Sequence, residues 1–522
     1  MVTSLHIYGM LTKTYGSAVY GVDAHIITVE TNIAGMGVNF YMVGLPDNAV
    51  KESQLRIRAA LKNVGYKTPG KTITINMAPA DIRKEGSAYD LTIAAGILAA
   101  SEQIKSERIS DYIIMGELSL DGGLQPIKGV LPIAIKAKEE GFKGFILPKK
   151  NAREAAIVDG LDVHGIENIK ELIDFFDGKV ELEKTIVNTR EEFYKNLSDT
   201  DLDFCDVKGQ ENIKRALEIA AAGGHNLLLI GPPGAGKTML AKRLPSILPP
   251  LSLKEALETT KIHSVAGKLG SETSLMTMRP FRSPHHTISD AALVGGGQIP
   301  QPGEISMAHN GVLFLDELPE FQRSVLEVMR QPLEDRVVTI SRARMSVEYP
   351  SNFMLVSSMN PCPCGFYNHP EKDCVCAPGV VQKYLNKISG PLLDRIDIHV
   401  EVTPVPINEL TDFTPAEKSE DVRKRVIVAR EKQVERFKDK PNVHCNAMMG
   451  TKILKEVCKI DEAGKNMLKK ATDRLGLSAR AFDRILKVSR TIADLEGAEN
   501  IEPNHLAEAI QYRSLDRQNW AG

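Results

Sequence analysis

Long apolar runs are absent from this sequence of 522 residues. The longest is LTIAAGILAA at about 91–100, which is too short to span a bilayer. The first 20 residues also lack the basic start and apolar core of a secretory signal. We therefore expect a cytoplasmic protein with no membrane contact.

Net charge and aromatic residues are also scarce. The formal net charge is -2, aromatic residues make up 5% of the chain, and there is one tryptophan. Any grip on nucleic acid must therefore come from a local basic surface or a pore, with little base stacking. The hydrophobic content of 43% and the charged content of 25% are ordinary for a soluble globular protein of two to four domains.

The sequence predicts a multi-domain α/β protein. Residues 1–175 alternate strand-like runs such as TITINMA with helical ones, which indicates a mixed α/β domain. Residues 176–203 are polar and are predicted to be a linker with one helix. Residues 204–405 follow the order of a parallel-sheet nucleotide-binding domain. Residues 406–522 are largely of helical periodicity, which predicts a small helical lid.

A phosphate-binding pattern dominates the second half of the chain. In NLLLIGPPGAGKT at 226–238, a short apolar run precedes GxxxxGKT. Its glycines permit a tight loop of backbone amides, its lysine reaches the β and γ phosphates, and its threonine ligates Mg²⁺. We therefore predict binding of ATP and Mg²⁺, the alternative being an unused glycine loop. The predicted nucleotide contacts are Gly231, Pro232, Pro233, Gly234, Ala235, Gly236, Lys237 and Thr238.

Two acids end the apolar run VLFLDE at 312–317. At the end of a buried strand beside a phosphate loop, one carboxylate can hold the magnesium shell and its neighbour can orient the attacking water. We assign Asp316 to magnesium and Glu317 to water. The alternative is a pair of solvated acids at a strand end.

Four of the seven cysteines lie within 15 residues, as C-P-C at 362–364 and C-V-C at 374–376. Four thiolates close a tetrahedral zinc site, so we predict structural zinc on Cys362, Cys364, Cys374 and Cys376. His369 is a spare ligand, and the alternatives are free thiols or a redox pair. The other three cysteines, Cys205, Cys445 and Cys458, are interpreted as packing residues.

Several longer motifs carry a family resemblance. The runs RPFRSPHHTISDAALVGGG, PGEISMAHNGVLFLDELPEF, SGPLLDRIDIHV and SARAFDRILKVSRTIADLEG closely resemble the magnesium-chelatase-like AAA+ ATPases of the ComM/YifB family. The resemblance implies that Asn360 helps to place the water and that Arg480 is a lid sensor for bound nucleotide. It also implies that Arg395 is a finger for the γ-phosphate of a neighbouring subunit, and hence an oligomer, expected to be a hexamer. The alternative for Arg395 is a salt bridge with Asp394.

The N-terminal region resembles the peptidase domain of Lon, through residues 84–101 and 116–151. Aligned without gaps, the Lon serine falls on Ala88 and the Lon lysine falls on Leu131. Ser87 and Lys128 lie nearby in sequence, but a Ser–Lys dyad requires hydrogen-bond contact. We predict a non-catalytic module, with a displaced Ser87–Lys128 pair as the alternative.

Candidate DNA contacts lie on a predicted hairpin that carries Arg342 and Arg344. The alternative is a charged, solvated hairpin edge. An insertion with further basic residues either lines a channel or packs on the core: Arg279, Arg282, His285 and His286.

The family resemblance implies a motor that moves DNA during branch migration or unwinding in homologous recombination, including the uptake of transforming DNA. Three other functions stay open. They are a protein-remodelling ATPase, a magnesium-insertion subunit for tetrapyrrole synthesis, and an ATP-dependent protease.

Overall fold

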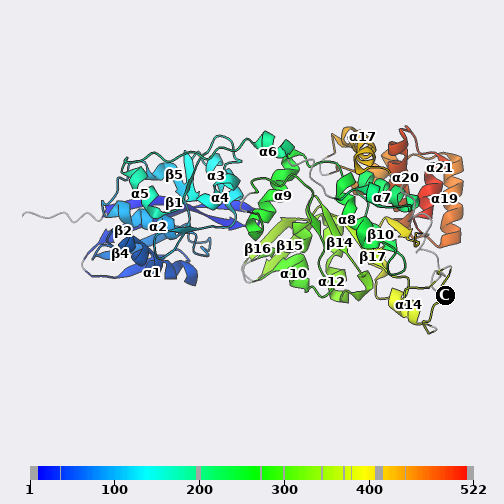
Figure 1. Cartoon of the computed structure of the whole chain (residues 1–522), viewed down its shortest axis with the longest axis horizontal. Coiled ribbons are helices and arrows are strands. Elements are labelled where there is room, and N and C mark those ends of the chain that lie inside the picture. Colours follow the sequence, from blue (N-terminus) through cyan, green and yellow to red (C-terminus); the bar gives the residue numbers. More distant parts are fainter. Residues whose placement is uncertain are drawn as a thin grey trace, which may run out of the picture. The chain divides into compact units, whose positions relative to one another are not determined.

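The computed structural model describes most of the chain, and its cartoon is drawn in Figure 1. The described residues are 10–35, 37–195, 202–270, 273–297, 300–342, 345–367, 369, 371–377, 379–405, 416–440 and 443–513. They group into two compact units. The first unit consists of Met1–Asn196 and Leu253–Thr277, and the second consists of Leu197–Ser252 and Met278–Gly522.

The first unit is built on a seven-stranded mixed sheet with the order β3-β4-β2-β1-β5-β8-β9. The β1–β2 and β2–β4 pairs are antiparallel and the other pairs are parallel. Its strands are β1 (Met10–Tyr20), β2 (Asp23–Ala34), β3 (Phe40–Val43), β4 (Thr72–Ala78), β5 (Tyr112–Ile114), β8 (Gly144–Pro148) and β9 (Asp162–Ile166). A small hairpin is formed by β6 (Glu117–Leu118) and β7 (Leu124–Gln125). The helices are α1 (Asn48–Asn63), α2 (Asp90–Ala100), α3 (Val130–Glu139), α4 (Lys149–Ala155), α5 (Ile169–Phe176), α6 (Thr189–Lys195) and α9 (Leu253–Ala266).

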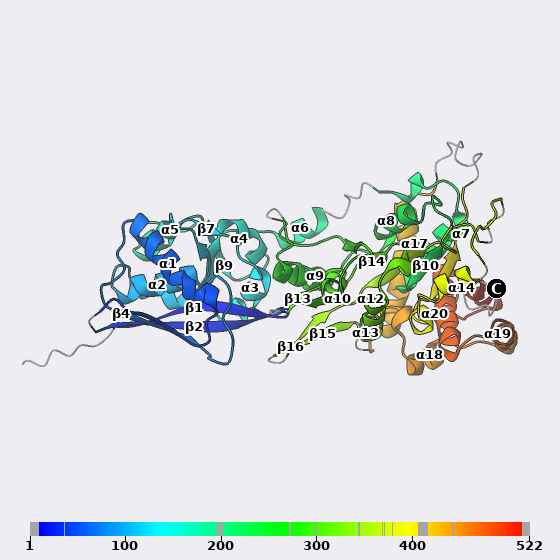
Figure 2. The same ribbon diagram turned by 90° about the horizontal axis from the view of Figure 1, so that it is seen from below.

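Helix α2 explains the most apolar run of the sequence. Each of its residues is buried, because α2 packs on β1 and β2 in the centre of the first unit. Figure 2 shows α1 and α2 on the same side of the β1–β2 pair. A helix that is apolar all round is a core helix when it is this short. None of the helices in the described ranges is long and apolar enough to cross a membrane.

Helix α9 comes from the middle of the predicted nucleotide domain, yet it belongs to the first unit. It packs on α3, and the Ser264 carbonyl accepts a hydrogen bond of 3.1 Å from the Gly129 amide. The Ser264 hydroxyl donates to the buried Glu154 carboxylate at 2.5 Å. The boundaries of 204–405 predicted from sequence place this helix with the nucleotide domain instead.

The second unit contains a five-stranded sheet with the order β11-β14-β17-β10-β18. Every pairing in it is parallel, as the sequence predicts. Its strands are β10 (Leu227–Ile230), β11 (Phe281–Arg282), β14 (Val312–Leu315), β17 (Met354–Met359) and β18 (Ile398–Glu401). Two hairpins lie outside this sheet: β12 (Gly295–Gly296) with β13 (Gln301–Pro302), and β15 (Val337–Arg342) with β16 (Met345–Pro350). The helices are α7 (Glu211–Gly223), α8 (Lys237–Ile247), α10 (Asp290–Val294), α11 (Glu304–Met307), α12 (Arg323–Val328), α13 (Arg330–Asp335), α14 (Val380–Leu385) and α15 (Gly390–Leu393).

The C-terminal region of the second unit is helical, which confirms the predicted fold class. Its helices are α17 (Ser419–Phe437), α18 (Thr451–Val457), α19 (Glu462–Leu475), α20 (Ala479–Glu496) and α21 (Pro503–Gln511). Helices α17 and α20 pack on α7, and one hydrophobic core is shared by the sheet and these helices. The lid is therefore packed against the nucleotide core as part of the same unit.

A series of buried polar contacts also joins the lid to the sheet. Asp397, just before β18, binds the His225 ring at 3.2 Å and the Arg484 guanidinium of α20 at 2.9 Å. The other ring nitrogen of His225 lies 2.8 Å from the Thr491 hydroxyl. His225, Asp397 and Thr491 are at most 1% exposed. These contacts link the lid to the start of β18 through buried polar groups, although among the described residues Asp397 Oδ1 has only its ion pair with Arg484 and no hydrogen bond.

Candidate nucleotide site

The phosphate loop connects β10 to α8 at the carboxyl end of the parallel sheet. Gly234 and Gly236 have φ angles of 80° and 87°, in the left-handed region that favours glycine. The Gly231 amide donates to the Met359 carbonyl at 3.1 Å, which fixes the loop to the end of β17. The loop thus has the strand–loop–helix setting that places backbone amides and a helix N-terminus around a phosphate.

Lys237, the first residue of α8, points back into the loop. Its Nζ atom donates to the carbonyls of Gly231 at 2.7 Å and Pro232 at 2.8 Å, and to Asn360 Oδ1 at 3.1 Å. Burial lowers the pKa of Lys237, although Asp316 and Glu317 oppose the shift. Lys237 and Asn360, both predicted from sequence, therefore meet at one point of the site.

Thr238 and Asp316 form the adjoining part of the site. Thr238 Oγ1 donates to Asp316 Oδ2 at 2.7 Å, and the Ser358 hydroxyl donates to Asp316 Oδ1. A hydroxyl and a carboxylate held together in this way suit Mg²⁺, which prefers hard oxygen ligands. Ser358 orients the carboxylate from the neighbouring strand β17.

Glu317 has an unusual backbone. Its φ and ψ angles are 55° and 51°, a left-handed conformation that is unfavourable for a residue with a Cβ atom. Its amide donates to Asp316 Oδ1 at 3.1 Å, and His286 Nδ1 lies 4.0 Å from its Oε2 atom. Backbone strain of this kind concentrates at functional sites, and here it turns the chain directly after the buried strand β14.

Arg480 is placed on the first turn of α20 with its side chain 58% exposed. Its guanidinium lies 3.9 Å from the Asp394 carboxylate. Among the described residues, no hydrogen bond joins Arg480 to the phosphate loop. Arg484, one turn further along α20, does connect the lid to the start of β18, and the sequence did not single it out.

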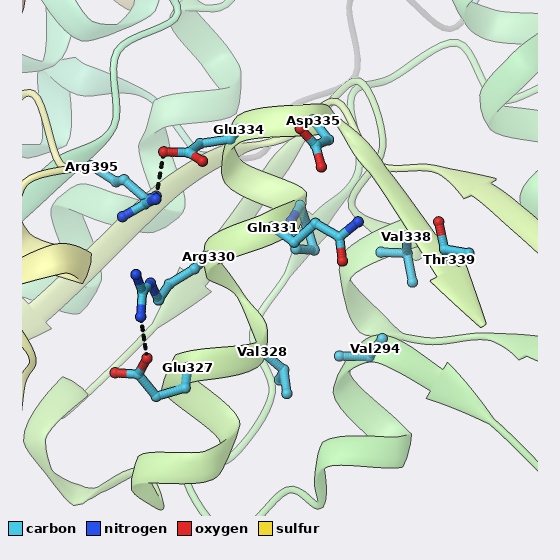
Figure 3. Close-up of a pocket in the computed structure, with 11 residues that line it drawn as sticks. Val294, Glu327, Val328, Arg330, Gln331, Glu334, Asp335, Val338, Thr339 and Arg395 are labelled. Carbon is cyan, nitrogen blue, oxygen red and sulfur yellow. Dashed lines mark hydrogen bonds and ion pairs between the residues drawn. The ribbon is translucent and has the colours of Figure 1, made fainter. Parts of the chain in front are cut away.

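Arg395 lies in a pocket of about 520 Å³, drawn in Figure 3. It is 5% exposed, and its Nη2 atom forms an ion pair with Glu334 Oε1 at 2.5 Å. The ion pair with Asp394 predicted as the alternative for Arg395 is not formed in the described structure, where Arg395 pairs with Glu334 instead. A second pair, Arg330 with Glu327 at 2.7 Å, lies in the same pocket.

The four clustered cysteines converge. Their sulfur atoms all lie within 4.8 Å of one another. Cys362 Sγ is 3.3 Å from Cys364 Sγ and 3.7 Å from Cys374 Sγ, and the latter two sulfurs are 3.5 Å apart. Four sulfurs about 2.3 Å from a zinc ion stand about 3.8 Å apart, so the cluster has the size of a tetrahedral site. The donor set fits zinc.

The basic residues predicted to contact DNA or line a channel lie in different environments. Arg342 is exposed at the end of β15, and Arg344 lies outside the described residues. Arg282 binds Glu304 at 2.6 Å, and Arg279 donates to the carbonyls of Pro249 and Asn310, both at 2.7 Å. The two arginines of the insertion therefore pack on the second unit, which is the second of the two predicted alternatives.

The predicted protease alternative requires Ser87 and Lys128 to meet. Ser87 instead donates to the Glu117 carboxylate. Lys128 lines a separate pocket of about 270 Å³ beside Gly267 and Glu154. No hydrogen bond links Ser87 to Lys128 in the part of the chain that the structure describes.

Two residues escaped the sequence motifs: Ser358, which contacts Asp316, and Glu334, which pairs with Arg395. Each acts through a neighbour distant in sequence. The one signal in the sequence is the pair Ser357 and Ser358 at the end of β17, whose side chains must face opposite sides of the sheet. This alternation does not tell which of the two contacts Asp316.

The parallel sheet, the glycine loop and the Lys237–Thr238–Asp316 arrangement define a P-loop nucleotide-binding protein. Three family models match it in succession. Residues 29–151 match subunit ChlI of Mg-chelatase, residues 203–410 match magnesium chelatase subunit ChlI, and residues 416–513 match the ChlI C-terminal region. The chain is thus an AAA+ ATPase of the magnesium-chelatase type.

Two full-length relatives narrow this class. The competence protein ComM of Haemophilus influenzae is 44% identical over 97% of this chain and 98% of its own length. YifB of Escherichia coli is also 44% identical, over the same shares. Lon protease 2 of Bacillus subtilis is 34% identical over 28% of this chain and 27% of its own length. The chain belongs to the ComM/YifB family of magnesium-chelatase-like proteins.

Proposed function

We propose that this protein hydrolyses ATP with the residues gathered at the end of β10, β14 and β17. Lys237 binds the β and γ phosphates, Thr238 and Asp316 hold Mg²⁺, Glu317 orients the attacking water, and Asn360 helps to position that water. The observation that carries the proposal is the convergence of Lys237, Asn360, Thr238 and Asp316 on one edge of the sheet. Mg²⁺ neutralises phosphate charge when it is bound.

The proposed ATPase works as a ring, expected to be a hexamer. Arg395 supplies positive charge to the γ-phosphate held by a neighbouring subunit, and Arg480 closes the lid on nucleotide. In the described conformation the Arg395 guanidinium is engaged by Glu334. Assembly would have to exchange this partner for phosphate. Residues 204–405 act as the ATPase core and 406–522 as its lid.

The polymer that the motor moves is proposed to be DNA, in branch migration or unwinding during recombination and transformation. Two observations support this. Arg342 stands exposed at the end of the β15–β16 hairpin, where it can contact phosphate. A relative that matches the chain end to end is named a competence protein.

We further propose that the four cysteines hold structural zinc. Their sulfur–sulfur distances fit the metal, and the four thiolates fill a tetrahedral shell without help from His369. A closed shell leaves no position for a catalytic water. Zinc would therefore stabilise the segment that follows β17.

A protein-remodelling ATPase is the second candidate, because the first unit exposes an apolar strand edge. The side chains around edge strand β3 are 48% to 70% exposed, namely Val38, Tyr41, Val43 and Leu45. Exposed apolar groups beside unpaired strand edges are typical of protein contacts. In this case the ATPase would respond to a protein and not to DNA.

Neither remaining alternative has such support. The displaced Ser87–Lys128 pair is not formed, so residues 1–175 are proposed to be a non-catalytic module. The module does not separate the chain from a chelatase subunit, because residues 29–151 match a family model of subunit ChlI of Mg-chelatase. The 67 kDa magnesium-chelatase subunit of Heliobacterium mobile is 28% identical over 31% of this chain.

The test is the rate of ATP hydrolysis at low salt, with and without single-stranded DNA and a synthetic four-way junction. Low salt matters because phosphate contacts are screened by ions. We expect strong stimulation by DNA, loss of all turnover in Glu317→Gln, and weaker stimulation in Arg342→Ala. Arg474→Ala, which removes an exposed arginine of α19, is the matched control and should respond as the unmodified protein does. ATP turnover that ignores DNA would favour the protein-remodelling function.

A further inference from the structure

The cysteine segment contacts the phosphate loop directly. Gly365, between the two cysteine pairs, is buried against Pro233. A Cβ atom added to Gly365 would lie 2.4 Å from Pro233 Cδ, closer than any van der Waals contact. The Gly365 amide in turn donates to the Cys362 carbonyl at 3.0 Å. The backbone of the cysteine segment thus abuts the loop that would surround the nucleotide phosphates.

Two more contacts join the phosphate loop to the residues just before the first cysteine, Met359 and Asn360. The Met359 carbonyl accepts from the Gly231 amide at 3.1 Å, and Asn360 Oδ1 accepts from Lys237 Nζ at 3.1 Å. Cys362, two residues after Asn360, is fully buried. Residues 359–365 therefore contact the phosphate loop at its start, its middle and its lysine, while they carry two of the four thiols.

The described part of the cysteine segment, residues 361–377, is held by side-chain contacts and not by secondary structure, for example by Lys372 over the Phe366 ring. Between β17 and α14, the described residues of 361–377 form neither helix nor strand. Ordering such a segment costs about 1–2 kcal/mol per residue in backbone entropy. A metal on four thiolates offsets this cost, because ligand binding and folding of the site are one process. Metal bound at the thiolates would therefore limit the movement of Gly365 against Pro233.

We propose that metal binding at the four cysteines and nucleotide binding at the phosphate loop are thermodynamically coupled, through the Gly365–Pro233 contact. This rests on the proposed function, namely nucleotide at the loop and zinc at the cysteines. The metal pre-organises the phosphate loop, so that less of the binding free energy of the nucleotide is spent on ordering the loop. By linkage, bound nucleotide raises the affinity for the metal by the same factor.

The experiment uses the full chain and a fluorescent, non-hydrolysable ATP analogue. Its dissociation constant is measured for zinc-loaded protein and for protein stripped with a chelator, with zinc content determined in both. We expect at least about fivefold weaker binding after stripping, within the usual range of coupling between sites. We also expect the analogue to slow release of zinc to a colorimetric chelator. Equal dissociation constants for the analogue in the zinc-loaded and the zinc-stripped protein would overturn the coupling, even if the protein binds both zinc and the analogue.

A substitution separates the contact from the metal. Gly365→Ala adds the methyl group that meets Pro233, and Gly379→Ala is its control. Both glycines have positive φ, at 86° and 78°, but a Cβ atom at Gly379 has nothing within 4 Å. We expect Gly365→Ala to retain one zinc per chain and to bind the analogue at least about fivefold more weakly, while Gly379→Ala changes neither.

Two results distinguish this inference from the functions on which it rests. Zinc-loaded Gly365→Ala that binds the analogue as tightly as Gly379→Ala would overturn the coupling alone. Failure of the unmodified protein to bind the analogue, or to bind zinc, would overturn the proposed nucleotide or zinc site together with the coupling. Should Gly365→Ala not fold, the comparison of loaded and stripped unmodified protein still decides.

Discussion

The Arg395 guanidinium is paired with the Glu334 carboxylate of its own chain at 2.5 Å, in a position where the arginine is 5% exposed. Residues proposed to act on a neighbouring subunit must be able to leave such partners. The Glu334 side chain is 49% exposed, so the pair is only half-buried and Arg395 can exchange this partner at a smaller cost than in a fully buried pair. In the proposed ring, Glu334 therefore competes with the γ-phosphate of the neighbouring subunit for Arg395.

Replacing Glu334 tests this competition. Glu334→Gln should free Arg395 and raise the maximal ATP turnover of the assembled protein severalfold, whereas Arg395→Ala should lower it at least about 1,000-fold, as loss of an arginine finger does. Glu327→Gln, which removes the partner of Arg330 in the same pocket, is the matched control and should leave turnover unchanged. A fall in turnover for Glu334→Gln would mean that Glu334 holds Arg395 in its working position instead.

Substitutions should separate nucleotide binding from ATP hydrolysis. Lys237→Ala should abolish nucleotide binding, because its amine is the one cation in the loop itself. Glu317→Gln should bind ATP yet fail to hydrolyse it, since only the group assigned to the water is altered. Equilibrium binding of labelled ATP, set beside phosphate release, measures both. Ordinary turnover in Glu317→Gln would refute the assignment of the water to Glu317.

Ser358 is expected to act through Asp316. In Ser358→Ala the carboxylate loses a charge-assisted hydrogen bond, so half-maximal ATPase activity should require about tenfold more Mg²⁺. Ser357 supplies the control, since its buried hydroxyl has no hydrogen-bond partner in the described structure. Ser357→Ala should leave the Mg²⁺ titration unchanged. Identical titrations for the two variants would remove Ser358 from the metal site.

Acid should destabilise the second unit. Burial lowers the pKa of His225, although Asp397 opposes the shift, and burial places the pKa of His399 well below its usual value. Below pH about 6.5 the unfolded chain therefore binds protons that the folded chain does not. From pH 7.5 to 5.5 the free energy of unfolding should fall by up to about 1.4 kcal/mol for each histidine.

The other buried groups of this cluster titrate outside that range. Burial opposes ionisation of Asp397, but Arg484 and His225 outweigh it and hold its pKa well below the usual range, so its contribution is lost only in stronger acid. Burial lowers the pKa of Lys487 to about 8, so this amine is protonated in both states below pH 7. Denaturant unfolding of His225→Gln should show a shallower pH dependence than the exposed control His444→Gln. Parallel pH profiles would contradict the assignment.

The sequence was most informative where function depends on contiguous residues. The strand, loop and helix of 226–238 follow from a short apolar run, glycines and the first turn of a helix, and the structure has all three. The cysteine cluster is similarly local. In contrast, Glu334 and Ser358 reach the site only through the tertiary fold, and no spacing rule connects them to Arg395 or Asp316.

The unit boundaries were not predictable for a related reason. Helix α9 has a large buried surface that includes the consecutive residues 262–265, and nothing in its sequence shows which neighbouring element covers it. What places it with α3 is a pair of contacts from Ser264, to Gly129 and Glu154, both more than a hundred residues earlier. A helical pattern predicts that a face is buried, but not which partner covers it.

The placement of α9 has a practical consequence for dissecting the protein. The polypeptide passes between the two units three times, once before 202 and again at each end of 253–277. An ATPase fragment that began at 204 would keep α9 but lose the rest of the first unit, including α3. Buried apolar residues of α9 such as Ile262 and Val265 would then be exposed to solvent. Such a fragment should aggregate, so the smallest piece that can be purified in working order is close to the whole chain.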